Sequence, residues 1–112
     1  MKATDELSVV FAALADPTRR EILDRLGAGP ASVATLRAPL PMSAPAVSQH
    51  LAVLERAGLI ERAAPARHRL VTARPERLDE AARWVQRHRR EWTERLDRLE
   101  RRVDALREEE DG

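Results

Sequence analysis

The sequence has no cysteine and very few aromatic residues, and each absence excludes or disfavours a class of site. Among 112 residues there is no cysteine and no tyrosine, with one phenylalanine and two tryptophans. Disulfides, thiolate metal sites and cysteine nucleophiles are therefore excluded. Stacking of single-stranded nucleic acid is disfavoured, because Phe11, Trp84 and Trp92 all lie away from the basic segment at 67–69.

The chain also lacks long apolar runs and a large net charge. No apolar run approaches the roughly 18 residues of a membrane span, and the first ten residues lack the pattern of a signal peptide. We therefore expect a cytoplasmic protein with no membrane partner. The formal net charge is +1, so a nucleic-acid site must come from local arrangement of cations. Of the 20 cations, 19 are arginine, which suits bidentate contacts with phosphate and guanine.

Helix-capping residues divide the first half of the chain into four short predicted helices. Each begins after a residue that caps helix N-termini well, and glycine or proline ends several of them. The predicted caps are Thr4, Asp16, Ser32 and Ser43, and the predicted stops are Gly27, Pro39 and Gly58. The fold class is therefore mainly α, and 112 residues suit one compact domain.

The second half predicts a β-hairpin and one long helix. Segments 59–62 and 67–72 are the only strand signal, around a turn at 63–66. After Pro75, apolar residues recur at steps of three and four, which is a heptad seam that needs a partner, most simply its own copy. We expect a DNA-binding region at 1–75, a dimerisation helix at 76–108 within the same domain, and a disordered tail at 109–112. The seam comprises Leu78, Ala82, Val85, Trp92, Leu96, Leu99, Val103 and Leu106, with Arg89 filling a gap.

The predicted helix at 43–57 has two unlike faces. Val47, Leu51 and Leu54 share a core face, and Gln49 points the opposite way. A short helix, a tight connector and a second capped helix resemble a helix-turn-helix, whose second helix enters the DNA major groove. The small, neutral start leaves room to approach base edges, and Gln49 can pair with adenine. The residues placed at the DNA are Ser43, Ala44, Ala46, Ser48, Gln49 and His50 on this helix, and Arg67, His68 and Arg69 on the hairpin, which would act as a wing.

Two motifs carry a family resemblance. "LADPTRREIL", "MSAPAVSQHLAVLERAGLIER" and the hairpin after them resemble the ArsR-type family of winged helix-turn-helix repressors in bacteria, over about residues 7 to 78. The resemblance implies a homodimer, paired through its first and last helices, that reads a palindromic operator and represses transcription. It places Ser43, Ala46, Ser48, Gln49 and His50 on the recognition helix and Arg67 at the wing tip. The dimerisation residues expected are Leu7, Phe11, Val85, Trp92, Leu96, Leu99 and Val103.

The motifs of metal-sensing members are absent. The region "SVATL" has no thiol, and Ala81 follows Asp79 where a histidine would complete an Asp-x-His pair. Only the half-motif of His88 and Glu91 remains, and two ligands cannot make the usual four-coordinate site. We therefore expect no metal and no cofactor, and a small-molecule effector, if there is one, is unidentified.

The sequence is also compatible with another class of function. The hairpin and seam would also suit an interaction module that docks a partner helix and binds no DNA. An enzyme is not expected, because no glycine-rich phosphate loop exists and Ser48 and His50 cannot face each other on a helix. For His50 a structural or phosphate-binding role is favoured over base contact, and Trp84 and Trp92 are expected to pack rather than form a ligand pocket.

Overall fold

The computed structural model describes residues 5–63 and 70–111, and the chain forms two compact units, Met1–Ala81 and Ala82–Gly112. The boundary between these units lies inside the last helix, whereas the sequence places the start of the dimerisation helix after residue 75; the predicted domain division stays a prediction. The boundary lies at this point because Ala81 is 4% exposed and belongs to the hydrophobic core of the first unit. The opening turns of that helix therefore fold with the first unit.

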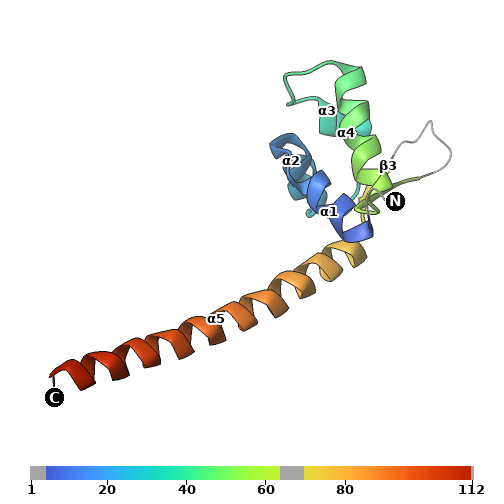
Figure 1. Ribbon diagram of the computed structural model, residues 1–112. Coiled ribbons are helices and arrows are strands. Elements are labelled where there is room, and N and C mark those ends of the chain that lie inside the picture. The colour runs from blue at the N-terminus through green and yellow to red at the C-terminus, as the bar shows by residue number, and fades with distance from the viewer. Residues whose placement is uncertain (1–4, 64–69, 112) are drawn as a thin grey trace. The chain divides into compact units, whose positions relative to one another are not determined.

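The first unit holds four helices, a small sheet and the start of a fifth helix (Figure 1). This arrangement confirms the predicted class, mainly α with a β wing and a long C-terminal helix. Figure 1 shows α1 to α4 gathered beside the strands. In chain order the elements are α1 (Glu6–Leu14), α2 (Pro17–Leu26), β1 (Ala31–Ser32), α3 (Val33–Arg37), α4 (Ala44–Arg56), β2 (Ile60–Arg62), β3 (Leu70–Ala73) and α5 (Glu76–Asp111).

The helix starts follow the caps read from the sequence, with one exception. The side chains of Asp16, Ser32 and Ser43 accept hydrogen bonds from backbone N–H groups at the starts of α2, α3 and α4, as predicted. For α1 the cap is Asp5, whose Oδ1 lies 2.7 Å from the backbone nitrogen of Ser8. The predicted cap, Thr4, lies outside the described residues.

The sheet has three strands in the order β1-β3-β2, all antiparallel. The hairpin of β2 and β3 was predicted, but β1 was missed. Two residues are too short to show an alternating pattern, and β1 exists only because Ala31 pairs with Val71 and Ser32 with Leu70. β2 begins one residue later than predicted, and the described part of β3 runs on to Ala73.

Each helix of the first unit contributes one buried face to the hydrophobic core. The core residues are 0% to 7% exposed, and burying each large side chain contributes roughly 1.5 to 3 kcal/mol to folding. α4 supplies Val47, Leu51 and Leu54, which confirms the predicted core face of this helix. The remaining core residues are Val10, Ala13, Ile22, Leu26, Leu36, Leu40, Ala57, Leu59, Ile60, Val71 and Ala81.

α5 is one unbroken helix through Asp111 (Figure 1). The sequence predicted a disordered tail from residue 109, but the described residues up to Asp111 are helical. Glutamate has high helix propensity, so the run at 108–110 continues the helix despite its repelling charges. Within the described residues, no helix combines the length and the apolar character that crossing a bilayer would need.

Candidate nucleic-acid interface

α3, the connector at 38–43 and α4 form the helix-turn-helix. Ser32 Oγ lies 3.0 Å from the backbone nitrogen of Thr35 and fixes the start of α3, and the side chain of Leu36 is fully buried. Ser43 Oγ lies 3.3 Å from the backbone nitrogen of Ala46 and fixes the start of α4. Pro45 sits in the first turn, where a missing N–H leaves no helical bond unmade. The first turn of α4 is thereby held without any bulky or charged side chain.

The two faces of α4 differ in burial as predicted. Val47 and Leu51 are 1% and 0% exposed, whereas Ser48 and Gln49 are exposed. Within the described part of the chain, neither Ser48 nor Gln49 has a side-chain hydrogen bond, so both polar groups are available to an external partner. Of the other predicted contact residues on this helix, Ser43 and Ala44 are exposed, and Ala46 and His50 are half-buried.

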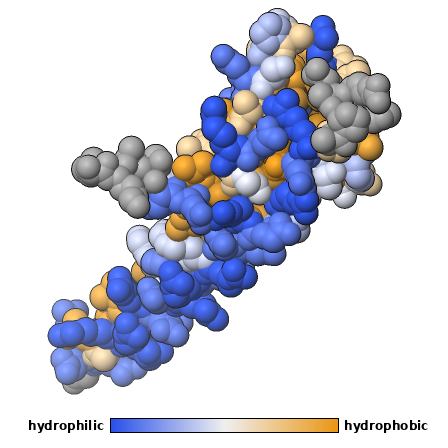
Figure 2. All heavy atoms as spheres, turned by 90° about the vertical axis from the view of Figure 1, so that its right-hand side faces the viewer, coloured by the Kyte–Doolittle hydropathy of each residue, from blue (hydrophilic) through white to orange (hydrophobic). Residues whose placement is uncertain are grey.

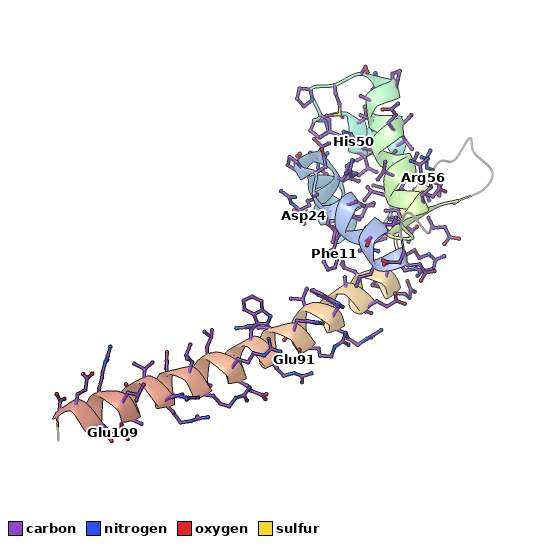
Figure 3. The ribbon with its side chains drawn as sticks, viewed as in Figure 1. Phe11, Asp24, His50, Arg56, Glu91 and Glu109 are labelled. Carbon is purple, nitrogen blue, oxygen red and sulfur yellow. The ribbon has the colours of Figure 1, made fainter. Side chains whose placement is uncertain are left out.

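His50 lies on the side of α4 that faces α2 (Figure 3). Its Nδ1 is 3.4 Å from Nη1 of Arg19 and 3.8 Å from Oδ2 of Asp16. Asp16 also accepts a hydrogen bond from the backbone N–H of Arg19, and this bond is the main reason that the pKa of Asp16 lies below its usual value. His50 thus has partners inside the protein, unlike the exposed Ser48 and Gln49 beside it.

The hairpin brings arginines beside acidic partners at its base. Arg74 pairs with Glu61 across β2 and β3, and Nε of Arg62 lies 3.4 Å from Oε1 of Glu55. Of these two pairs, only that of Arg62 and Glu55 links the hairpin to α4, which contacts β2. The predicted wing residues Arg67, His68 and Arg69 lie outside the described residues, so their placement stays a prediction.

The predicted dimerisation residues of the second unit have no partner helix within it. Val85, Trp92, Leu96, Leu99 and Val103 are 39% to 66% exposed. Figure 2 shows a surface dominated by hydrophilic residues, with apolar residues showing between them. In the first unit, Phe11 is 37% exposed, while Leu7 is half-buried and packs on the core.

The aromatic residues of α5 make local contacts. The rings of Trp84 and His88 stack with centroids 4.0 Å apart, and Nδ1 of His88 is 2.9 Å from the carbonyl oxygen of Trp84. An open groove of about 410 Å³ runs along Trp84, Val85, His88, Arg89 and Trp92. Among the described residues there is no group of three or more His, Asp or Glu side chains that could hold a metal ion.

Sequence reasoning missed the role of Arg19. Its side chain reaches the last turn of α1 and His50 on α4, and the second contact spans 31 residues of sequence. In the sequence it is one of two adjacent arginines after Pro17, and no local pattern distinguishes it from Arg20.

Known proteins share both the sequence motif and the fold. Residues 14–63 match the model of a helix-turn-helix domain family. The HTH-type transcriptional regulator Rv2034 of Mycobacterium tuberculosis is 58% identical over 48 residues, which are 43% of this chain and 45% of that protein. The transcriptional repressor SdpR of Bacillus subtilis is 41% identical over 51 residues, 46% of this chain and 57% of that protein. The matched segments thus span about half the length of these two relatives.

A solved structure extends the match to most of the chain. The crystal structure of the ArsR family transcriptional regulator RHA00566 superposes with a TM-score of 0.75 and 35% sequence identity, covering 79% of this chain and 91% of that one. The chain belongs to the ArsR family of transcriptional regulators. It has the winged helix-turn-helix fold of that family, and the relatives named here are regulators rather than enzymes.

Proposed function

We propose that this ArsR family member is a homodimeric repressor that reads a palindromic DNA operator through α4 and the wing around Arg67. The observation that carries the proposal is the exposed face of α4. It is slim enough for a major groove about 12 Å wide, and it presents polar groups that have no partner within the described chain.

Each part of this face has a chemical role in the proposal. In a bidentate pair with adenine, the side-chain N–H of Gln49 can donate to N7, and its carbonyl oxygen can accept from the N6 amino group. Ser43, Ala44, Ala46 and Ser48 keep the helix start narrow, and the backbone N–H of Ala44, the first residue of α4, can donate to a phosphate. Arg67, His68 and Arg69 would contact flanking phosphates or the minor groove.

Dimerisation through α5 would set two copies of α4 about 34 Å apart, one turn of DNA. The support is the seam of the second unit, whose apolar residues are exposed along the helix and repeat in heptads. Leu7 and Phe11 on α1 are the proposed contribution of the first unit. The regulator would block transcription when bound.

In vitro selection from a pool of randomised duplexes tests this proposal without knowledge of the operator. We expect enrichment of a palindrome whose half-sites lie about one helical turn apart. If the dimer neutralises six to ten phosphates, affinity should fall roughly 10³- to 10⁵-fold between 50 and 200 mM salt. A pool that stays random after repeated rounds would contradict the proposal.

The second candidate function is protein docking through α5. The exposed seam of the second unit favours it, because this surface would also suit a helix of another protein. The two functions differ in solution behaviour. We expect the repressor to sediment as a dimer by itself at about micromolar concentration, whereas a docking module would stay monomeric until its partner is added.

A further inference from the structure

The guanidinium of Arg19 joins three helices. Its Nε donates to the carbonyl oxygen of Ala13 at 2.7 Å, and its Nη2 donates to that of Ala12 at 2.9 Å. Both carbonyls belong to the last turn of α1, where helical partners run out. Its Nη1 lies 3.4 Å from Nδ1 of His50 on α4, while its own backbone belongs to the first turn of α2.

The contact with His50 has a defined direction. Arginine can only donate, so in this hydrogen bond the acceptor is Nδ1 of the imidazole. Arginine also offers its donors in a rigid plane. Two of these donors, Nε and Nη2, are bound to the end of α1, so Nη1 has little freedom to move. Nη1 therefore holds His50, and with it this part of α4, in place.

This point lies next to the proposed reading group. His50 follows Gln49 directly, and the exposed amide of Gln49 has no bond of its own within the described chain that would place it. A bidentate base contact needs its donor and acceptor held to within about 0.5 Å by the groups that support them. Rotation of α4 about its axis would move Gln49 away from its base, and the contact between Arg19 and His50 opposes that rotation.

Arg20 provides an internal comparison. It also caps α1, because its Nη1 donates to the carbonyl oxygen of Leu14 at 2.7 Å, but its side chain is exposed and, within the described chain, has no hydrogen bond or ion pair with α4. Both arginines therefore donate to carbonyl oxygens at the end of α1, but only Arg19 also contacts α4.

We propose that Arg19 is a positioning residue for sequence reading, which holds α4 in register through His50 and anchors it to the end of α1. The inference rests on the proposed function, because it concerns how α4 is presented to DNA. Arg19 itself need not touch DNA. Its effect should therefore appear in the preference for one sequence over another.

The experiment measures binding of the full-length chain to two duplexes by fluorescence anisotropy. One is the duplex selected by the wild-type protein from a randomised pool, and the other is a scrambled duplex of equal length. Arg19→Gln should lower the preference for the selected duplex about tenfold, the discrimination of one good base contact. Partial unfolding would weaken binding to both duplexes equally, so it would leave this ratio unchanged.

Three further variants keep the result interpretable. Arg20→Gln is the matched control and should keep the wild-type preference, since it removes a cap of α1 only. Arg19→Lys keeps the charge but cannot bridge two carbonyls and an imidazole, so it should lower the preference even if Arg19→Gln folds poorly by circular dichroism. The double variant Arg19→Gln, His50→Ala should lose no more preference than the worse single variant.

Three results would overturn the inference. An unchanged preference in both Arg19 variants would show that the contact does not position α4. An equal loss in Arg20→Gln would assign the effect to the end of α1 rather than to His50. A wild-type protein without any preference would overturn the proposed function, and this inference with it.

Discussion

α4 buries one side along its length, whereas the part of α5 in the second unit buries none of its described residues. α4 turns Val47, Leu51 and Leu54 into the core and leaves its other face polar. Residues 82–111 of α5 are exposed or half-buried throughout, although apolar residues repeat along them. A helix stabilised by its own domain can present its free face to a ligand, but a helix with an open apolar seam gains most of its stability from a partner.

The comparison separates two kinds of stability. The core under α4 belongs to one chain, so its contribution does not depend on protein concentration. The seam of α5 would contribute only on association, so its contribution should rise with concentration. The proposed repressor needs both, because two copies of α4 must be placed on one duplex.

The largest effect is expected from breaking the seam. Leu96→Asp or Leu99→Asp would place two unpaired carboxylates in each dimer interface, at a cost of several kcal/mol, and should raise the dimer dissociation constant by about 100-fold or more. Sedimentation equilibrium measures this constant. Arg101→Asp, on the opposite side of the helix, should leave it within about threefold. A dimer that survives both leucine changes would mean that the copies associate elsewhere.

Leu51→Ala tests the other side of the comparison. Removing a fully buried leucine from the core should lower the free energy of unfolding of the first unit by about 2 to 5 kcal/mol. Urea denaturation at two protein concentrations measures it, and the loss should be the same at both. A loss that shrinks on raising the concentration would show that Leu51 supports association instead.

Gln49→Ala addresses the free face of α4. It should cost about 1 to 3 kcal/mol on the selected duplex and relax preference at one base pair, because one bidentate contact is lost. Arg67→Ala, by contrast, should weaken all duplexes alike. Anisotropy titrations with single-base variants of the duplex report both. Equal losses for Gln49→Ala on selected and scrambled DNA would refute base reading by this residue.

The smallest effect concerns the cap of α2. The pKa of Asp16 is lowered in the fold, mainly by the backbone N–H of Arg19, so its carboxylate stabilises the fold above the unfolded pKa of about 3.9. This contribution is lost as the pH falls through the lower, folded value. Asp16→Asn keeps a good cap but cannot titrate. Its urea midpoint should therefore fall less steeply than that of the wild type below about pH 4, and parallel profiles would contradict this assignment.

Local chemistry explains which parts of the fold were predictable. The caps Asp16, Ser32 and Ser43 and the core face of α4 were predicted because each depends on residues within a few positions of one another. β1 was missed because its two residues form a strand only by pairing with β3, far along the chain. The cap of α1 was placed one residue too early because threonine and aspartate both suit that position.

The candidate site also has one part that could be predicted from the sequence and one part that could not. The exposed face of α4 could be derived from helical periodicity, since Ser48 and Gln49 lie opposite the buried leucines. The contact of Arg19 with His50 could not, because it joins residues that only the packed fold brings together. The metal half-motif at His88 has a local partner instead, since its ring stacks on Trp84.

The central claim is that α4 reads a DNA sequence, and a competition between two duplexes tests it most directly. Wild-type protein would be titrated by fluorescence anisotropy at about 150 mM salt against the duplex selected from a random pool and against its scrambled counterpart. We predict binding in the nanomolar range, as is typical of sequence-specific DNA-binding proteins, with at least about a hundredfold preference for the selected duplex. Weak and equal binding to both duplexes would contradict the claim and favour protein docking through α5.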